Sequence, residues 1–330
     1  MKLTADSSIN LHAVATVAGL GEFSISSVGV VAEQQLNSVH QGQVIAAFER
    51  CFYVKTATGI FCVGIPEIGR GPLNALLDFQ YKRLPFNVTA GEHVRISSHQ
   101  ITLDDRRIID GAQACAYHCE VSFAMPTPEI LQRNRKALAT LRGMPDDGFF
   151  WLLGNHISCG QESAVQSALR RSTSVALNGL VNWLQTGIFC SSGESISHDA
   201  SAALGLLGAG PGLTPAGDDV IAGVMLALTR LQRSDLTKSL WNAIAPRLAE
   251  LTNAISAAHL EQAAKGFCGE PMNDLLNEVF QAEEMEATTL VTALNCMGGT
   301  SGWDTLGGAV MVIDAWQYSL HTTHRTATTC

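Results

Sequence analysis

The segment with the most chemical potential runs from Gly208 to Asp219 and reads Gly-Ala-Gly-Pro-Gly-Leu-Thr-Pro-Ala-Gly-Asp-Asp. Its four glycines and two prolines exclude a regular helix or strand. The apolar run that follows, 220–228, predicts a buried helix. A glycine loop that opens a helix presents backbone N–H groups at the positive end of the helix dipole, where anions bind. The predicted anion-binding residues of this loop are Gly210, Gly212, Thr214 and Gly217.

The two aspartates at the end of this loop have two readings. Either Asp218 or Asp219 could cap the helix, and one of them would suffice for that. Two carboxylates beside four glycines favour a catalytic role instead. The loop is no Walker motif, because it lacks a Gly-Lys-Ser/Thr ending, and its prolines interrupt any dinucleotide-binding fingerprint.

A second segment, 298–308, repeats the same design before another largely apolar run. Three positions recur at spacings 0, +2 and +6, namely Gly217, Asp219 and Gly223 in the first segment and Gly302, Asp304 and Gly308 in the second. We predict two similar loop-to-helix turns that face one ligand, whereas the alternative is a shared packing or capping solution. The second turn adds Thr300, Ser301 and Gly302 as predicted binding residues and Asp304 as a catalytic one.

A third loop, 66–74, follows a predicted strand and contains Gly69-Arg-Gly-Pro-Leu-Asn74. Its arginine, Arg70, could offer a bidentate guanidinium to a carboxylate or phosphate, with Asn74 nearby. A plain surface turn explains the loop equally well.

The composition excludes several classes of function. The formal net charge of −9 and the lack of a basic stripe argue against nucleic-acid binding. No apolar run is long enough for a membrane span. The chain has nine cysteines but no CxxC pair, and its start has no apolar signal core, so we expect a cytoplasmic protein.

The patterning predicts an α+β protein that changes character near residue 125. A small antiparallel, barrel-like β domain is expected over 1–125 and a mainly helical domain with the glycine loops over 126–330. The predicted strands are Gln43–Val54, Ile60–Ile65, His93–Ser97, Gln100–Leu103, Arg106–Ile109 and Glu120–Ala124. The predicted helices are Glu129–Arg142, Glu162–Thr186, Asp218–Leu231, Leu236–Ala264, Met272–Ala282, Glu286–Cys296 and Asp304–Ser319.

Taken together, 210–219, the Thr-Ser-Gly-Trp-Asp of 300–304 and the Gly-Arg-Gly-Pro-Leu-Asn of 69–74 resemble a bacterial family. This is the AllH-type subunit family of oxamate carbamoyltransferase, from the allantoin branch of purine catabolism. The resemblance spans most of the chain and is weaker in its first third. In relatives the place of Ala216 is commonly Ser, so this chain lacks one hydroxyl there.

The resemblance implies a carbamoyltransferase subunit that converts oxalurate and phosphate to oxamate and carbamoyl phosphate. It also implies FdrA-like and AllG-type companion subunits, without which the chain is not expected to be active. In such an enzyme the aspartates would hold the carbamoyl amino group, or Asp218 and Asp219 would hold Mg²⁺. The alternative is a non-catalytic scaffold or small-anion-binding subunit, which the lack of an obvious general base favours.

Overall fold

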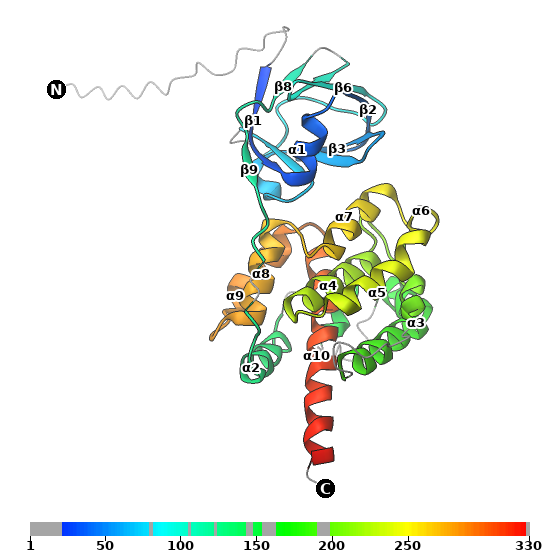
Figure 1. Cartoon of the computed structure of the whole chain (residues 1–330). Helices are drawn as coiled ribbons and strands as arrows, with labels where there is room; N and C mark the ends of the chain where they lie inside the picture. The colour runs from blue at the N-terminus through cyan, green and yellow to red at the C-terminus, as the bar shows by residue number, and fades with distance from the viewer. Residues whose placement is uncertain are drawn as a thin grey trace, which may run out of the picture.

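The computed structural model describes residues 22–78, 82–104, 107–121, 124–142, 148–153, 163–189 and 199–327. It has two parts, a β-rich part over 22–117 that lies against one end of a helical part over 128–327 (Figure 1). Each part has its own apolar core. The predicted α+β architecture is therefore confirmed.

The β-rich part is a closed barrel. Its strands are β1 (Glu22–Gly29), β2 (His40–Ala47), β3 (Cys51–Thr56), β4 (Ile60–Gly64), β5 (Asn74–Leu77), β6 (His93–Ser97), β7 (Gln100–Leu103), β8 (Ile108–Asp110) and β9 (Cys115–Tyr117). They follow the order β5-β4-β3-β2-β6-β7-β8-β1-β9, and a β5–β1 pairing closes the ring. A short helix, α1 (Val30–Leu36), packs against it. Closure pairs β5 with β1, so neither strand has a free edge, and β9 adds to the ring only through its pairing with β1.

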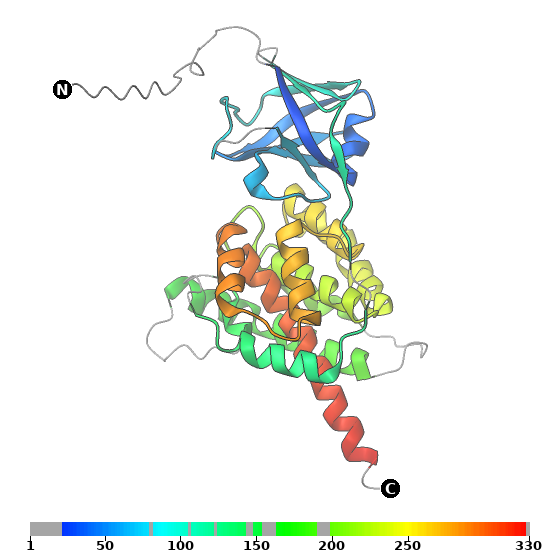
Figure 2. The same ribbon diagram turned by 90° about the vertical axis from the view of Figure 1, so that its left-hand side faces the viewer.

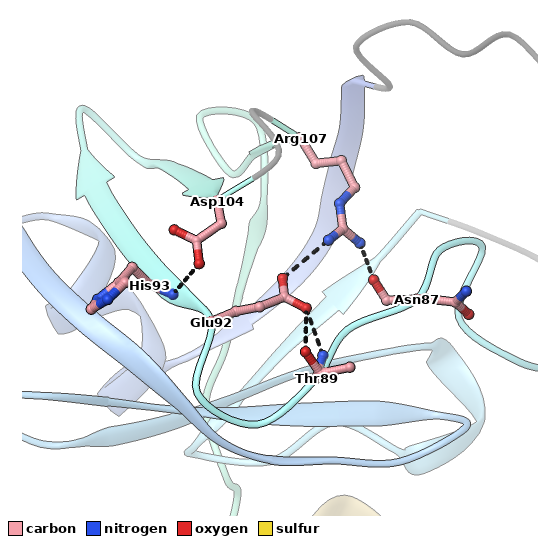
Figure 3. Close-up of polar contacts among 6 residues, drawn as sticks. All are labelled: Asn87, Thr89, Glu92, His93, Asp104 and Arg107. Atoms are coloured by element: carbon pink, nitrogen blue, oxygen red, sulfur yellow. Dashed lines mark hydrogen bonds and ion pairs between the residues drawn. The ribbon is translucent and has the colours of Figure 1, made fainter.

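Polar contacts secure one end of the barrel, where β6 and β8 begin (Figure 3). The guanidinium of Arg107 donates to Glu92 at 3.1 Å and to the Asn87 carbonyl. Glu92 in turn accepts the N–H and hydroxyl of Thr89. Arg107 also stacks on Phe86, with its guanidinium carbon 4.9 Å from the ring centroid. These contacts fix the loop that leads into β6.

The barrel differs from the sequence prediction in three ways. Among the described pairings, β1–β8, β1–β9 and β4–β5 are parallel, so the sheet is mixed rather than wholly antiparallel. The strand predicted over 43–54 is a tight hairpin of β2 and β3, because the N–H of Phe48 bonds the Cys51 carbonyl. The strand predicted over 120–124 is not formed at the described residues 120, 121 and 124, and residues 106, 122 and 123 lie outside the described chain.

The helical part contains α2 (Pro128–Leu138), α3 (Ala164–Phe189), α4 (Ala216–Arg230), α5 (Ser234–Ile244), α6 (Leu248–Leu251), α7 (Ala254–Ala264), α8 (Glu270–Gln281), α9 (Ala287–Cys296) and α10 (Ser301–Ala327). After β9 the chain runs past α8 and reaches α2 at the end of the helical part that is distant from the barrel (Figure 2). The single helix predicted over 236–264 is three helices, α5, α6 and α7. No helix of the described residues is long and apolar enough to cross a membrane.

Two helices, α4 and α10, cross at the centre of the helical part and are almost wholly buried where they meet. Their glycines make reciprocal contacts. A Cβ on Gly223 would lie 1.9 Å from the Thr305 carbonyl oxygen, and a Cβ on Gly308 would lie 2.0 Å from the Val220 carbonyl oxygen. In each repeat, the glycine at position +6 thus lies against the backbone carbonyl of the residue at position +3 in the other repeat. This close crossing brings the two N-termini together.

Candidate functional site

A cavity of about 450 Å³ lies where the barrel meets the helical part. Both glycine turns contribute to its wall, through Thr214 and Asp219 from the first and Ser301 and Gly302 from the second. Asn74, at the start of β5, lines it from the barrel side. The structure therefore brings five of the predicted site residues to one cavity.

The polar centre of this cavity is a cluster formed by Thr214, Asp219 and Ser301. The Thr214 hydroxyl donates to Asp219 Oδ2 at 3.1 Å and lies 2.9 Å from the Ser301 hydroxyl. Since Thr214 belongs to the loop before α4 and Ser301 is the first residue of α10, these bonds join the two repeats. The cluster offers a carboxyl and two hydroxyls to a ligand.

Asp219 is held in conditions that favour its protonated form. Burial raises the pKa of Asp219 well above its usual value, and the nearby charge of Asp304 raises this pKa further. Hydrogen bonds from Ser301 and Thr214 oppose the shift only in part. A carboxyl whose pKa is raised in this way is suited to act as a general acid.

Tyr53 from β3 and His259 from α7 also line the cavity. The Tyr53 hydroxyl and His259 Nε2 are 3.5 Å apart, and the contact links the barrel to the helical part. Burial lowers the pKa of His259 to about 4, so its imidazole is neutral at physiological pH. His259 is not among the predicted site residues, because nothing in the sequence indicates that Tyr53 lies against α7.

Asp218 does not share the cavity with Asp219, which argues against the catalytic role predicted for it. Its side chain is 1% exposed and accepts the Gly208 N–H at 2.8 Å, the Ser256 hydroxyl at 2.6 Å and the Thr252 hydroxyl. These three donors tie the glycine loop to the start of α7. Its role in the structure is therefore to hold the loop. Asp218 and Asp219 face different surroundings because consecutive helical residues point about 100° apart.

Asp304 also points away from the cavity. Its carboxylate is fully buried and accepts the backbone N–H of Phe149. It therefore anchors the segment around residue 149 to the first turn of α10. Asp219 accepts the Thr214 hydroxyl and Asp304 accepts the Phe149 N–H, and neither carboxyl accepts an N–H of its own helix start among the described contacts. These contacts argue against the capping explanation of the repeated aspartates.

Burial raises the pKa of Asp304 from 3.8 to about 7. Because the folded protein favours the protonated carboxyl, the stability that this group contributes is present below about pH 4 and is lost as the pH rises to about 7. We expect Asp304→Asn to remove this dependence, since an amide keeps the acceptor for Phe149 and never ionises. The measurement is urea unfolding of both proteins from pH 4 to 8. A constant difference in stability across that range would contradict the assignment.

The remaining predicted site residues lie outside the cavity. Arg70 forms a bidentate ion pair with Glu270 of α8 and stacks on Tyr117, 5.0 Å from the ring centroid. The carboxylate that Arg70 binds is thus the chain's own, and a ligand contact of Arg70 stays a prediction. The glycines Gly210, Gly212 and Gly217 and the side chain of Thr300 are likewise not on the cavity wall.

The backbone of the first loop corrects the electrostatic part of the prediction. The N–H of Gly217 donates to the Ala209 carbonyl at 2.8 Å, and those of Asp218 and Asp219 donate to the Pro215 carbonyl. These donors are therefore used within the protein and cannot bind an anion. The positive φ angles of Gly210 (98°) and Gly212 (110°) instead serve the tight course of the loop.

The Mg²⁺ site suggested for Asp218 and Asp219 does not fit this geometry. The Asp218 carboxylate accepts three protein donors and does not line the cavity that Asp219 lines. The described residues contain no group of three or more His, Cys, Asp and Glu side chains placed to hold a metal ion.

Residues 206–313 match the model of a protein family described as oxamate carbamoyltransferase subunit AllH. The match includes both glycine turns, the cluster of Thr214, Asp219 and Ser301, and the crossing of α4 and α10. The region that contains the two glycine turns is therefore similar to the AllH family. No solved structure matches the chain. The matched region ends before the C-terminal turns of α10 and excludes the barrel, so Tyr53 and Asn74 are site candidates on the structure alone.

Proposed function

We propose that this chain is a subunit of a carbamoyltransferase that converts oxalurate and phosphate to oxamate and carbamoyl phosphate. The observation that supports this most is the meeting of Asp219, Thr214 and Ser301 in one cavity inside the region that matches the AllH family. A buried carboxyl with a raised pKa beside two hydroxyls suits a substrate whose reacting end is an uncharged ureido group.

The reaction requires one proton to move. A phosphate oxygen attacks the carbamoyl carbon of oxalurate, the bond from that carbon to the oxamate nitrogen breaks, and the nitrogen gains a proton. Hydrogen phosphate loses the proton that the oxamate nitrogen gains, so atoms and charge balance. An unprotonated amide anion is a poor leaving group, so an acid beside the nitrogen lowers the barrier.

We assign that acid to Asp219. Its protonated carboxyl would donate to the departing nitrogen and then recover the proton from the attacking phosphate. The Thr214 and Ser301 hydroxyls, 2.9 Å apart, would rotate away from their contacts within the cluster and donate to the carbamoyl oxygen as negative charge builds there. Neutral His259 and Tyr53 line the same cavity and would position the ureido group.

The charge of the cavity supports the need for companion subunits. Oxalurate carries a carboxylate, and phosphate adds one or two negative charges at neutral pH. Within the described chain, Arg50 is the one lysine or arginine on the cavity wall. We therefore propose that FdrA-like and AllG-type subunits supply further cations. This same observation favours the second candidate, a subunit that binds a small anion while a companion carries out the chemistry.

Ligand binding tests the proposal. In complex with its companions, the chain should be stabilised against heat by oxalurate, oxamate and phosphate, because a ligand that binds only the folded state raises the melting temperature. Thr214→Val combined with Ser301→Ala should abolish the shift caused by oxalurate. Ser174→Ala is the matched control, since that hydroxyl donates to the Arg171 carbonyl on α3, away from the cavity.

The two candidate functions separate in the same preparation. Turnover by the complex that is lost in Asp219→Asn, with oxalurate binding retained, supports the catalytic subunit. Binding without any effect of Asp219→Asn on turnover supports the anion-binding subunit. If none of the three ligands stabilises the complex, the proposed function is wrong.

A further inference from the structure

A second cluster of reactive groups lies beside the cavity and is not used by the proposed reaction. Cys119 follows β9 in the connection to α2, and Cys268 directly precedes the N-cap of α8. The Cys119 thiol hydrogen-bonds the thiol of Cys268, which also interacts with the guanidinium of Arg230 at the end of α4. Three segments far apart in the sequence thus meet at two sulfur atoms.

Arg230 is the unusual member of this cluster, because a charged side chain is only 1% exposed. Its guanidinium donates to the Leu226 carbonyl at 3.2 Å and to Asn273 Oδ1 at 2.9 Å, and its Nε has no hydrogen-bond partner. Among the described residues no carboxylate forms an ion pair with it. A buried cation requires a counter-ion. The groups here that can supply negative charge to Arg230 are the two thiols.

Cys119 is the thiol placed to carry that charge. Its sulfur accepts the backbone N–H of Cys268 at the start of α8 and is also hydrogen-bonded by the thiol of that residue. With the Cys268 thiol bond as the largest cause and the charge of Arg230 adding to it, the pKa of Cys119 is lowered to about 6. A helix N-terminus and a nearby arginine are the surroundings in which cysteines become reactive.

Cys119 and Cys268 differ in their pKa and in their position relative to the cavity. Both residues are partly exposed, so a small oxidant can reach them. The pKa of Cys268 is raised, chiefly by its bond to Cys119, so this residue stays a thiol beside the Cys119 thiolate. Cys268 also lines the cavity, whereas Cys119 does not. A change at Cys119 therefore reaches the cavity through Cys268.

We propose that Cys119 and Cys268 form a peroxide-sensitive dithiol, with Arg230 as the counter-ion of the Cys119 thiolate. The Cys119 thiolate attacks hydrogen peroxide, forming an S–O bond and releasing hydroxide. The Cys268 thiol then attacks the sulfur of the Cys119 sulfenic acid, an S–S bond forms, and water leaves. Peroxide is reduced by two electrons and the two thiols are oxidised to one disulfide. The disulfide would tie the connection after the barrel to the cavity wall. This inference is independent of the proposed carbamoyl transfer.

Alkylation of the full-length chain tests the thiolate. We expect Cys119 to react with iodoacetamide with a midpoint near pH 6, and at pH 7 on the order of ten-fold faster than Cys115. Cys115 is the matched control because it is exposed and only four residues away. Arg230→Met should move the midpoint upward and Arg230→Lys should restore it in part. A midpoint near that of an ordinary thiol in the unaltered protein would overturn the proposal, whether or not the variants fold.

Peroxide treatment followed by peptide mass mapping tests the disulfide. The expected product is a Cys119–Cys268 disulfide, which Cys115→Ser leaves unchanged. In Cys268→Ser, dimedone should trap a sulfenic acid at Cys119. A disulfide mapped to Cys51 and Cys62, with Cys119 and Cys268 still reduced, would refute the proposal. None of these measurements depends on oxalurate turnover, so their failure leaves the proposed function untouched.

Discussion

Replacing Asp219 by Asn should lower the turnover of the reconstituted enzyme by about 10²- to 10⁴-fold, the usual contribution of a general acid or base. The amide has the size of the carboxyl and can still accept the Thr214 hydroxyl, but it has no proton to give to a leaving nitrogen. Its fold should be preserved, because the substitution removes a buried ionisable group. The measurement is kcat of the complex together with a melting curve.

Asp304→Asn is the matched control for this experiment, since it changes the same residue type at the same position of the second repeat. Its carboxylate binds the Phe149 N–H outside the cavity, so this variant should keep most of the activity. Its pH profile should move to lower pH, because the charge of Asp304 no longer raises the pKa of Asp219. The unaltered enzyme should also lose activity as the pH rises through the raised pKa of Asp219, because only the protonated form donates. Full activity in Asp219→Asn would exclude the acid role.

The second large effect concerns stability. Gly223→Ala and Gly308→Ala should each lower the free energy of unfolding by about 3 kcal/mol or more, at the upper end of what overpacking costs. The new Cβ would lie 1.9 Å or 2.0 Å from a carbonyl oxygen of the other helix. Backbone atoms cannot move aside as a side chain can, so α4 and α10 would have to separate.

Gly307→Ala on α10 is the control, because its Cβ would meet Leu152 at 3.4 Å, an ordinary contact. Alanine favours a helix over glycine by about 1 kcal/mol, so this variant should be as stable as the unaltered protein or more so. Urea unfolding of the three variants gives the comparison. If Gly223→Ala and Gly307→Ala unfold alike, the close crossing of α4 and α10 is not what holds the two turns together.

Local patterns were sufficient for much of the fold. The strands β6 and β7 have the predicted bounds, because alternating residues and turn signals are local properties. Most helices follow their apolar spacing in the same way. The prediction failed where a contact distant in sequence decides the conformation. One example is β5, a strand of four residues that exists because β4 and β1 pair with it.

The repeated Gly-x-Asp spacing is the clearest feature that the sequence determined by itself. It predicted two equivalent turns with helices behind them, and the spacing of +6 is the one at which α4 and α10 exchange glycine contacts. Those turns lie in the region that matches the AllH family. The sequence could not distinguish the aspartates, since Asp218, Asp219 and Asp304 all occupy first turns of helices.

Tertiary structure alone separated those aspartates. Asp218 meets the hydroxyls of 252 and 256 because α7 packs beside the loop, whereas Asp219, one residue later, faces the cavity. The barrel completes that cavity with Tyr53 and Asn74, more than 130 residues earlier in the chain. Which side chains share a buried space, and therefore which carboxyl is dehydrated enough to keep its proton, depends on how α4, α7, α10 and the barrel pack together. That packing is set by contacts between distant residues, which no local spacing in the sequence encodes.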